Sequence, residues 1–216
     1  MIELLVFDLD GTLVDSRRDL SESANELLAE CGCPVQPEEA IGRMIGEGAA
    51  MLVSRAFAAS GSVLPPDALS RFLAIYDRRL LESTRPYPEM GEVLTVLGSR
   101  YPMAVLTNKP YASTLRILDG LDLARHFEAD RVIGGDGPWP RKPDPAGLRF
   151  LCSSAGVEPA ATMLVGDSLI DWRTAREAGT RVCLAQYGFG FDGFPVEVLS
   201  GDEGRIGSPV ELLSIL

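Results

Sequence analysis

The pattern of apolar and polar positions predicts strands that alternate with helices over most of the chain. Short apolar runs typical of buried parallel strands lie at residues 2–7, 103–106, 131–133, 162–165 and 182–185. Apolar residues at helical spacing occur at 89–97, 111–118 and 209–215, and in two further segments that end near residues 155 and 178. This alternation predicts βα units, and therefore an α/β fold with a doubly wound parallel sheet.

Four consecutive helices are predicted between the first strand and the second. In the first helix, Leu20 and Leu27 recur at helical spacing, and Gly32 follows the last turn. The other three begin near residue 37, cover 49–59 and run from 65 to 80, the last with Leu69 expected on its apolar face.

These helices divide the chain into two predicted parts. We expect an α/β core of residues 1–15 and 84–216 and an all-helical insert, residues 16–83, that interrupts the core after the first strand. An insert at this point lies above the carboxyl edge of the sheet and can act as a lid. The glycine-rich segment 188–207 is predicted to be loop.

The first predicted strand ends at two aspartates, Asp8 and Asp10, with Gly11 directly after them. Ligands of open α/β sheets bind at the carboxyl ends of strands, so both carboxylates are candidate functional groups. Alternate side chains of an extended chain point the same way, and two charges ~4 Å apart repel by about 4 kcal/mol at an effective dielectric of ~20. A divalent cation would offset this repulsion. The alternative is that both aspartates cap the following turn.

Three further segments place polar side chains at the same edge of the predicted sheet. Thr107 and Asn108 follow the second strand, Lys142 lies in a loop, and Asp167 follows the fourth strand with Asp171 one helical turn later. Parallel strands end at a common edge, so we expect these groups to converge on the two aspartates. Each also has a structural interpretation, because Thr, Asn and Asp cap helices and a loop lysine is commonly solvated.

This set of groups favours phosphoryl chemistry. Carboxylate and backbone oxygens suit a hard cation such as Mg²⁺. A hydroxyl, a lysine and loop amides suit the oxygens of a phosphoryl group. Because no histidine, cysteine or serine–base pair is present among these groups, the available nucleophile is an aspartate, which can form an aspartyl-phosphate. The second aspartate can protonate the leaving oxygen and then activate water.

Composition and charge narrow the classes of partner. Hydrophobic residues make up 46% and charged residues 24% of the 216 residues, as in an ordinary globular protein. The net charge of −11 argues against nucleic acid or an anionic membrane as partner. No apolar run approaches the ~20 residues of a membrane helix, and the N-terminus lacks the basic region of a signal peptide. These features, with four scattered cysteines, predict a cytoplasmic protein. The single histidine, His126, has no catalytic partner nearby.

The motifs at the strand ends resemble those of the haloacid dehalogenase superfamily. The segment Asp8-Leu-Asp-Gly-Thr-Leu-Val-Asp-Ser16 is similar to the first motif of that superfamily and Thr107-Asn108 to the second. Lys142-Pro143 is similar to the third motif, and Gly166-Asp-Ser-x-x-Asp171 to the acidic fourth. The resemblance covers the whole chain. It implies a Rossmann-like core, a helical cap of the first type and Mg²⁺-dependent phosphoryl transfer.

The resemblance also implies a role for each site residue. Asp8 would be the nucleophile and a metal ligand, and Asp10 the general acid/base, which binds the metal through its backbone carbonyl. Asp167 would be a further metal ligand, and Asp171 would support it through water. The residues expected to hold the transferring phosphoryl group are Thr107, Asn108 and Lys142.

Within the superfamily, the chain is similar to phosphoglycolate phosphatases. The likeness rests on Ile45-Gly-Glu-Gly48 in the cap, Thr107-Asn-Lys-Pro110 and Tyr187-Gly-x-Gly190. The residues of the cap that we expect to contact substrate are Arg43, Gly46, Glu47 and Gly48.

The expected function is that of a phosphomonoesterase for a small phosphorylated metabolite, with 2-phosphoglycolate as a candidate substrate. Two alternatives remain, a phosphomutase of the β-phosphoglucomutase type and a non-catalytic binding module on the same fold. Dehalogenation is disfavoured because it needs neither the proton transfer of Asp10 nor a Mg²⁺ site. The sequence is compatible with a monomer or a homodimer.

Overall fold

Six parallel strands form the central sheet of the computed structural model, which describes residues 1–216. Their order across the sheet is β5-β4-β1-β6-β7-β8. Their bounds are β1 Leu4–Phe7, β4 Met103–Leu106, β5 Val132–Ile133, β6 Thr162–Gly166, β7 Arg181–Ala185 and β8 Gly204–Ile206. The chain runs outward from β1 through β4 to β5 and then crosses to β6, so the strand order reverses beside β1. This topology confirms the predicted Rossmann-like, doubly wound fold.

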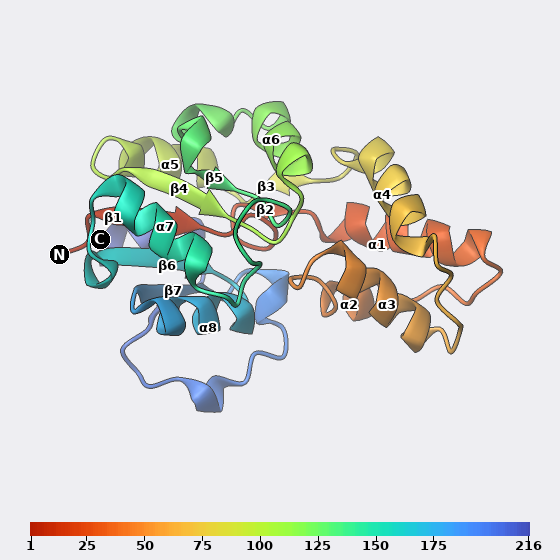
Figure 1. The fold of residues 1–216 in the computed structure, drawn as a ribbon. Helices are drawn as coiled ribbons and strands as arrows, with labels where there is room; N and C mark the ends of the chain where they lie inside the picture. Colours follow the sequence, from red (N-terminus) through yellow and green to blue (C-terminus); the bar gives the residue numbers. More distant parts are fainter.

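Helices cover both faces of the sheet (Figure 1). Alternate residues of β1 face opposite sides, so that Leu5 and Phe7 join one hydrophobic cluster while Leu4 and Val6 join the other. The first cluster includes residues of α5 Met90–Gly98, α6 Tyr111–Gly120 and α9 Leu212–Ile215, and the second residues of α7 Ala146–Ala155 and α8 Leu169–Ala178. The two apolar layers explain why the strands read as continuous apolar runs.

Four helices form the insert, as predicted from the apolar spacing. They are α1 Arg17–Glu30, α2 Glu38–Gly42, α3 Ala49–Ala59 and α4 Ala68–Arg79. Leu27, Phe57 and Phe72 are fully buried where the helices pack together. Figure 1 shows the helices beyond the carboxyl ends of the strands, with both chain termini at the opposite end of the molecule. The division into domains at residues 16 and 83 stays a prediction.

The two connections between core and insert lie side by side as a short antiparallel ribbon. The ribbon pairs β2 Val14–Asp15 with β3 Arg85–Pro86. Next to it, the fully buried carboxylate of Asp19 accepts hydrogen bonds from the backbone N–H groups of Ser83 and Thr84 and from the Thr84 hydroxyl, at 2.7 to 3.0 Å. Because buried donors are costly when unpaired, Asp19 fixes where the chain re-enters the core.

Two predictions of detail are wrong. The segment 188–207 is not wholly loop, because it contains two 3₁₀ turns and the edge strand β8, which pairs with β7. This strand has only three residues and only Ile206 is buried, so it lacks the apolar run of an interior strand. Leu69 is 39% exposed and lies off the apolar face of α4.

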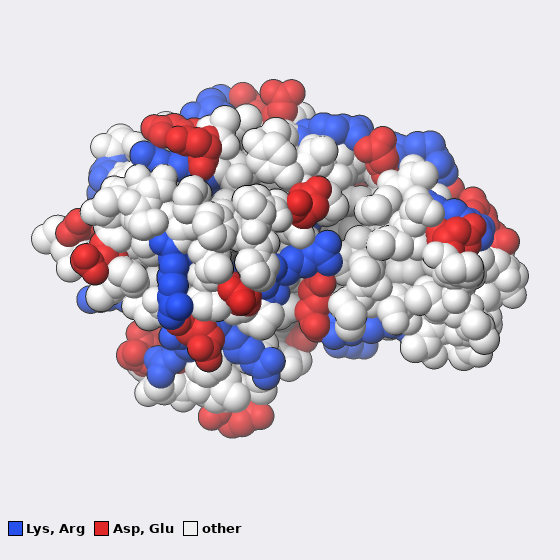
Figure 2. Space-filling view, in the orientation of Figure 1, with Lys and Arg blue, Asp and Glu red and all other residues white.

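Charges of both signs are mixed on the surface that Figure 2 shows, and the four cysteines are unpaired. Basic and acidic side chains are mixed over the face in Figure 2 and form no continuous basic patch. None of the helices combines the length and the apolar character that a transmembrane span requires. All four cysteines are free thiols, and Cys152 and Cys183 are buried.

Candidate active site

The polar residues predicted at the strand ends come together at the point where the strand order reverses. Asp8 and Asp10 follow β1, Thr107 follows β4 and Asp167 follows β6, and these three strands are neighbours in the sheet. Lys142 reaches the same place from the loop between β5 and α7. Parallel strands that end together therefore bring groups up to 159 residues apart in the chain into one site.

Three buried carboxylates form the centre of the site. Oxygens of Asp8, Asp167 and Asp171 all lie within 4.8 Å of one another. The ammonium of Lys142 lies 2.9 Å from Asp8 Oδ1 and 2.6 Å from Asp171 Oδ1. Lys142 thus provides one positive charge against three carboxylates in an environment almost closed to solvent.

The electrostatics of this cluster favour a bound cation. Burial raises the pKa of Asp8 to about 7, the Lys142 ammonium opposes this rise, and the neighbouring carboxylate of Asp171 adds to it. Burial, followed by Asp171 and Asp8, also raises the pKa of Asp167 well above its usual value. Such shifts mean that the negative charge is incompletely balanced. An all-oxygen donor set of this charge fits a hard divalent ion such as Mg²⁺.

Glycines surround the carboxylate of Asp167. The backbone N–H of Gly190 donates a 2.7 Å hydrogen bond to Asp167 Oδ2. A Cβ atom on Gly11 would lie 1.9 Å from that oxygen, and one on Gly190 would lie 2.7 Å from it. The tyrosine that precedes this turn, Tyr187, donates from its hydroxyl to the carbonyl of Thr12 at 3.0 Å. The start of the glycine-rich segment 188–207 therefore holds Asp167 against the β1 loop.

Asp171 has a structural task as well as a place in the cluster. It is residue N3 of α8, where it forms a capping box with Ser168. Its Oδ2 accepts hydrogen bonds from the backbone N–H of Ser168 at 3.1 Å and from the Ser168 hydroxyl at 2.6 Å. The capping box leaves Oδ1 for Lys142. Asp171 therefore orients Lys142 as well as adding charge beside Asp167.

Asp10 lies outside the carboxylate cluster and faces the insert. The hydroxyl of Ser16 donates to its Oδ1 at 2.5 Å, and the ammonium of Lys109 lies 2.9 Å from its Oδ2. Lys109 also donates to the hydroxyl of Tyr76 in α4, at 2.8 Å. Asp10 is therefore linked to the insert through one buried lysine. Its expected metal contact through the backbone carbonyl stays a prediction.

The residues expected to hold a phosphoryl group lie around Asp8. The Thr107 hydroxyl accepts a 3.2 Å hydrogen bond from the backbone N–H of Lys109. The Asn108 amide donates to the carbonyls of Gly46 in the insert and Lys142 in the core, at 2.8 and 2.9 Å. The carbonyl oxygen of the Asn108 side chain is buried and has no hydrogen-bond partner. These contacts fix the orientation of both side chains, and both residues line the same cavity as Asp8.

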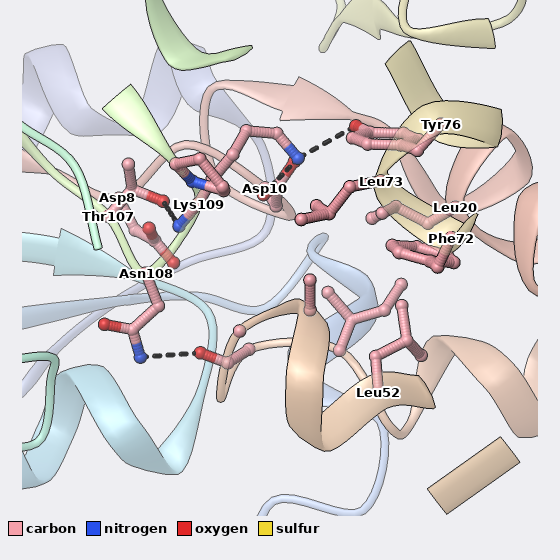
Figure 3. Close-up of a pocket in the computed structure, with 15 residues that line it drawn as sticks. Asp8, Asp10, Leu20, Leu52, Phe72, Leu73, Tyr76, Thr107, Asn108 and Lys109 are labelled. Carbon is pink, nitrogen blue, oxygen red and sulfur yellow. Dashed lines mark hydrogen bonds and ion pairs between the residues drawn. The ribbon is translucent and has the colours of Figure 1, made fainter. Parts of the chain in front are cut away.

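A cavity between core and insert opens onto Asp8 and Asp10 (Figure 3). The insert supplies an apolar wall that includes Leu20, Leu52 and Phe72. Of the expected substrate contacts in the insert, Gly46 and Gly48 line this cavity. The remaining two do not, because Arg43 is exposed and Glu47 pairs with Arg55.

Sequence reasoning did not identify Lys109 and Tyr76 as site residues. Tyr76 has the helical spacing of a core residue, and nothing local distinguishes it from its apolar neighbours. Lys109 directly follows Thr107 and Asn108 at the end of a strand, and this position could have identified it as a site residue. His126, in contrast, contacts Arg125 and does not line the cavity.

Comparison with known proteins identifies relatives over nearly the whole chain. Residues 5–185 match the model of the haloacid dehalogenase-like hydrolase family. The phosphoglycolate phosphatase of Rhodospirillum rubrum is 42% identical over 88% of this chain and 81% of its own length. That of Haemophilus influenzae is 35% identical over 99% and 98%, respectively. A crystal structure described as that of a predicted phosphoglycolate phosphatase from Haemophilus somnus matches with a TM-score of 0.89 and 30% identity, covering 99% of this chain and 97% of that one. The chain therefore belongs to the haloacid dehalogenase-like hydrolase family.

Proposed function

We propose that the protein is a Mg²⁺-dependent phosphomonoesterase that acts on a small phosphorylated metabolite, with 2-phosphoglycolate as the first candidate. The observation that carries this proposal is the position of Asp8. It lies beside the carboxylates of Asp167 and Asp171, the ammonium of Lys142 and the cavity wall. Relatives 35 to 42% identical are named phosphoglycolate phosphatase, which supports the choice of substrate.

Asp8 is the nucleophile in this proposal. Its carboxylate attacks the phosphorus of the bound ester, so that a bond forms between Asp8 and phosphorus while the bond to the leaving oxygen breaks. Asp8 Oδ1 already accepts a 2.7 Å hydrogen bond from the backbone N–H of Leu9, which fixes the orientation of its carboxyl group. Thr107 and Lys142 hold the phosphoryl oxygens through their hydroxyl and ammonium groups. Asn108 does so through its backbone N–H, because both N–H groups of its side chain already donate to the carbonyls of Gly46 and Lys142.

Asp10 moves the proton in both halves of the reaction. It gives a proton to the leaving alkoxide and later takes one from the water that releases phosphate from Asp8. Ser16 and Lys109 hold its carboxyl group at the cavity that Asp8 also lines, which supports a role for Asp10 beside the nucleophile. When bound at the carboxylate cluster, Mg²⁺ supplies positive charge that offsets the charge on the phosphoryl oxygens.

A panel of phosphate esters tests this proposal. Release of inorganic phosphate is measured for 2-phosphoglycolate, glycerol phosphates and hexose phosphates, in Mg²⁺ and in EDTA. We expect Mg²⁺-dependent release, with 2-phosphoglycolate among the best substrates. Transfer of the phosphoryl group to a second hydroxyl of a hexose, without phosphate release, would support the phosphomutase alternative. No turnover of any ester would support a non-catalytic module.

A further inference from the structure

Both lysines of this chain are buried at the proposed active site. The chain has only two lysines, Lys109 and Lys142, and their side chains are 4% and 2% exposed. Lys142 has a task in the proposed phosphoryl transfer. Lys109 has so far been given only the task of holding the Asp10 carboxyl group, and no contact with the substrate. Burial of a charged amine is costly, and such residues are rarely placed without a partner or function.

Lys109 retains hydrogen-bonding capacity toward the cavity. An ammonium group donates three hydrogen bonds. The structure gives Lys109 two polar partners, Asp10 Oδ2 at 2.9 Å and the Tyr76 hydroxyl at 2.8 Å. Lys109, Asp10 and Tyr76 all line the cavity (Figure 3). One ammonium donor is therefore available to a molecule bound there.

Positive charge is otherwise absent from the end of the cavity that faces the insert. Among the residues that line the cavity, Lys109 is the only one with a cationic side chain. Tyr76 is the only polar side chain that the insert supplies, and the rest of its wall is apolar or glycine. An anionic group at this end would therefore have to be recognised by Lys109, with the Tyr76 hydroxyl beside it.

The distance from Asp10 limits which part of a substrate reaches Lys109. Asp10 protonates the leaving oxygen in the proposed function, and the Lys109 ammonium lies 2.9 Å from its carboxylate. The group bonded to the carbon that carries the leaving oxygen is therefore the part of the substrate that lies next to Asp10 and Lys109. In a phosphorylated 2-hydroxy carboxylate, that group is the carboxylate.

We propose that Lys109 and Tyr76 form a subsite for the carboxylate of the leaving group. This inference rests on the proposed phosphatase function and deepens it, because it makes phosphorylated 2-hydroxy carboxylates the preferred substrate class. Lys109 bridges Asp10 and the substrate carboxylate, which is a charge-assisted contact between buried groups. Lys109 thereby selects the substrate and aligns its leaving oxygen with Asp10.

A matched pair of substrates separates recognition from positioning. Ethyl phosphate replaces the carboxylate of 2-phosphoglycolate by a methyl group and keeps the rest. For Lys109→Met we expect the ratio of kcat/KM for 2-phosphoglycolate over ethyl phosphate to fall roughly tenfold or more. Tyr76→Phe should lower the same ratio by a smaller factor. The control Leu69→Met, at an exposed position of the same helix that does not line the cavity, should keep it.

Equal losses on both substrates in Lys109→Met would overturn the subsite, because Lys109 would then only position Asp10. A wild-type enzyme that hydrolyses both substrates equally well would also overturn it, while leaving the phosphatase function intact. Tyr76→Phe provides the same test should Lys109→Met not fold.

Binding without turnover makes the subsite testable apart from the proposed function. The probes are 3-phosphonopropionate, which replaces the bridging oxygen of 2-phosphoglycolate by carbon, and propylphosphonate, which lacks the carboxylate. Calorimetry should show tighter binding of the first probe to the wild type and a loss of that preference in Lys109→Met. In protein labelled with ¹⁵N-lysine, which carries only two side-chain ammonium groups, the first probe should shift the Lys109 signal more than the second does. Equal shifts would contradict the subsite. Preferential binding by a protein that hydrolyses no ester would contradict the proposed function and not the subsite.

Discussion

The ammonium of Lys142 lies 2.6 Å from a carboxylate oxygen of Asp171, and both side chains are buried. The same ammonium is 2.9 Å from Asp8 Oδ1. Lys142 is thus the one cationic side chain that lies between Asp8, the candidate nucleophile, and Asp171 in the first turn of α8. A buried charge pair of this kind contributes little net stability as a pair, but loss of one partner leaves the other uncompensated.

Lys142→Met should therefore destabilise the metal-free protein. Without the ammonium, three carboxylates within 4.8 Å of one another lose their only close positive charge. We expect the free energy of unfolding in EDTA to fall by about 3 kcal/mol, and saturating Mg²⁺ to recover part of the loss. Urea unfolding of both proteins, with and without Mg²⁺, measures this. Arg125→Met, which removes an exposed cation paired with Asp122, is the control and should cost less than about 1 kcal/mol. Equal costs for the two variants would contradict the role of Lys142.

Gly190→Ala should weaken Mg²⁺ binding. The backbone of Gly190 donates to Asp167, and a Cβ atom there would lie 2.7 Å from the accepting oxygen, so the carboxylate has to move. Changes to groups that orient metal ligands typically cost 10- to 100-fold in affinity, and we expect roughly tenfold here. Calorimetric titration with Mg²⁺ measures the change. The control is Gly91→Ala in α5, where the added Cβ meets no atom within 4 Å. Unchanged Mg²⁺ affinity in Gly190→Ala would show that the turn at Gly190 does not orient a ligand of the metal ion.

Glu203 should make stability depend on acid pH. Partial burial tends to raise the pKa of this carboxyl, but hydrogen bonds from the Trp172 indole and from the backbone N–H groups of Ser200 and Gly201 outweigh it and lower the pKa from 4.5 to about 2. The folded protein thus binds this proton less tightly than the unfolded chain. Glu203 therefore contributes stability above the unfolded pKa of 4.5 and loses it as the pH falls toward about 2.

Unfolding by urea at about pH 6 and about pH 3.5 tests this linkage. The difference in unfolding free energy between the wild type and Glu203→Gln should be smaller at the lower pH. Val196→Ala, at an exposed position of the same segment that carries no titratable group, should show no such change. A difference for Glu203→Gln that grows at the lower pH would show that the carboxyl has the opposite shift.

The fold and the catalytic groups were predictable because their signals are local. Each interior strand is an apolar run that stops at a polar residue, and parallel strands end at one edge. The positions of Asp8, Thr107 and Asp167 therefore follow from the strands that precede them. The four helices of the insert carry their own apolar spacing and are likewise visible in the sequence.

The parts that could not be predicted depend on contacts between distant segments. Lys109 and Tyr76 are 33 residues apart, and their hydrogen bond exists only because the insert folds back over the sheet. Gly190 and Asp167 meet because the chain leaves β7 and crosses the end of β6. The short strand β8 is stabilised by its pairing with β7, since its own three residues have little apolar character. No local pattern encodes such partners.

Steady-state release of phosphate from 2-phosphoglycolate by Asp8→Asn is the most direct test of the proposed mechanism. The amide can still accept the hydrogen bond from the Leu9 N–H, but it cannot form the bond to phosphorus. We predict that kcat falls roughly a thousandfold or more in saturating Mg²⁺. Asp122→Asn, which changes an exposed carboxylate that does not line the cavity, should match the wild type. Wild-type turnover by Asp8→Asn would show that Asp8 is not the nucleophile and would contradict the proposed mechanism.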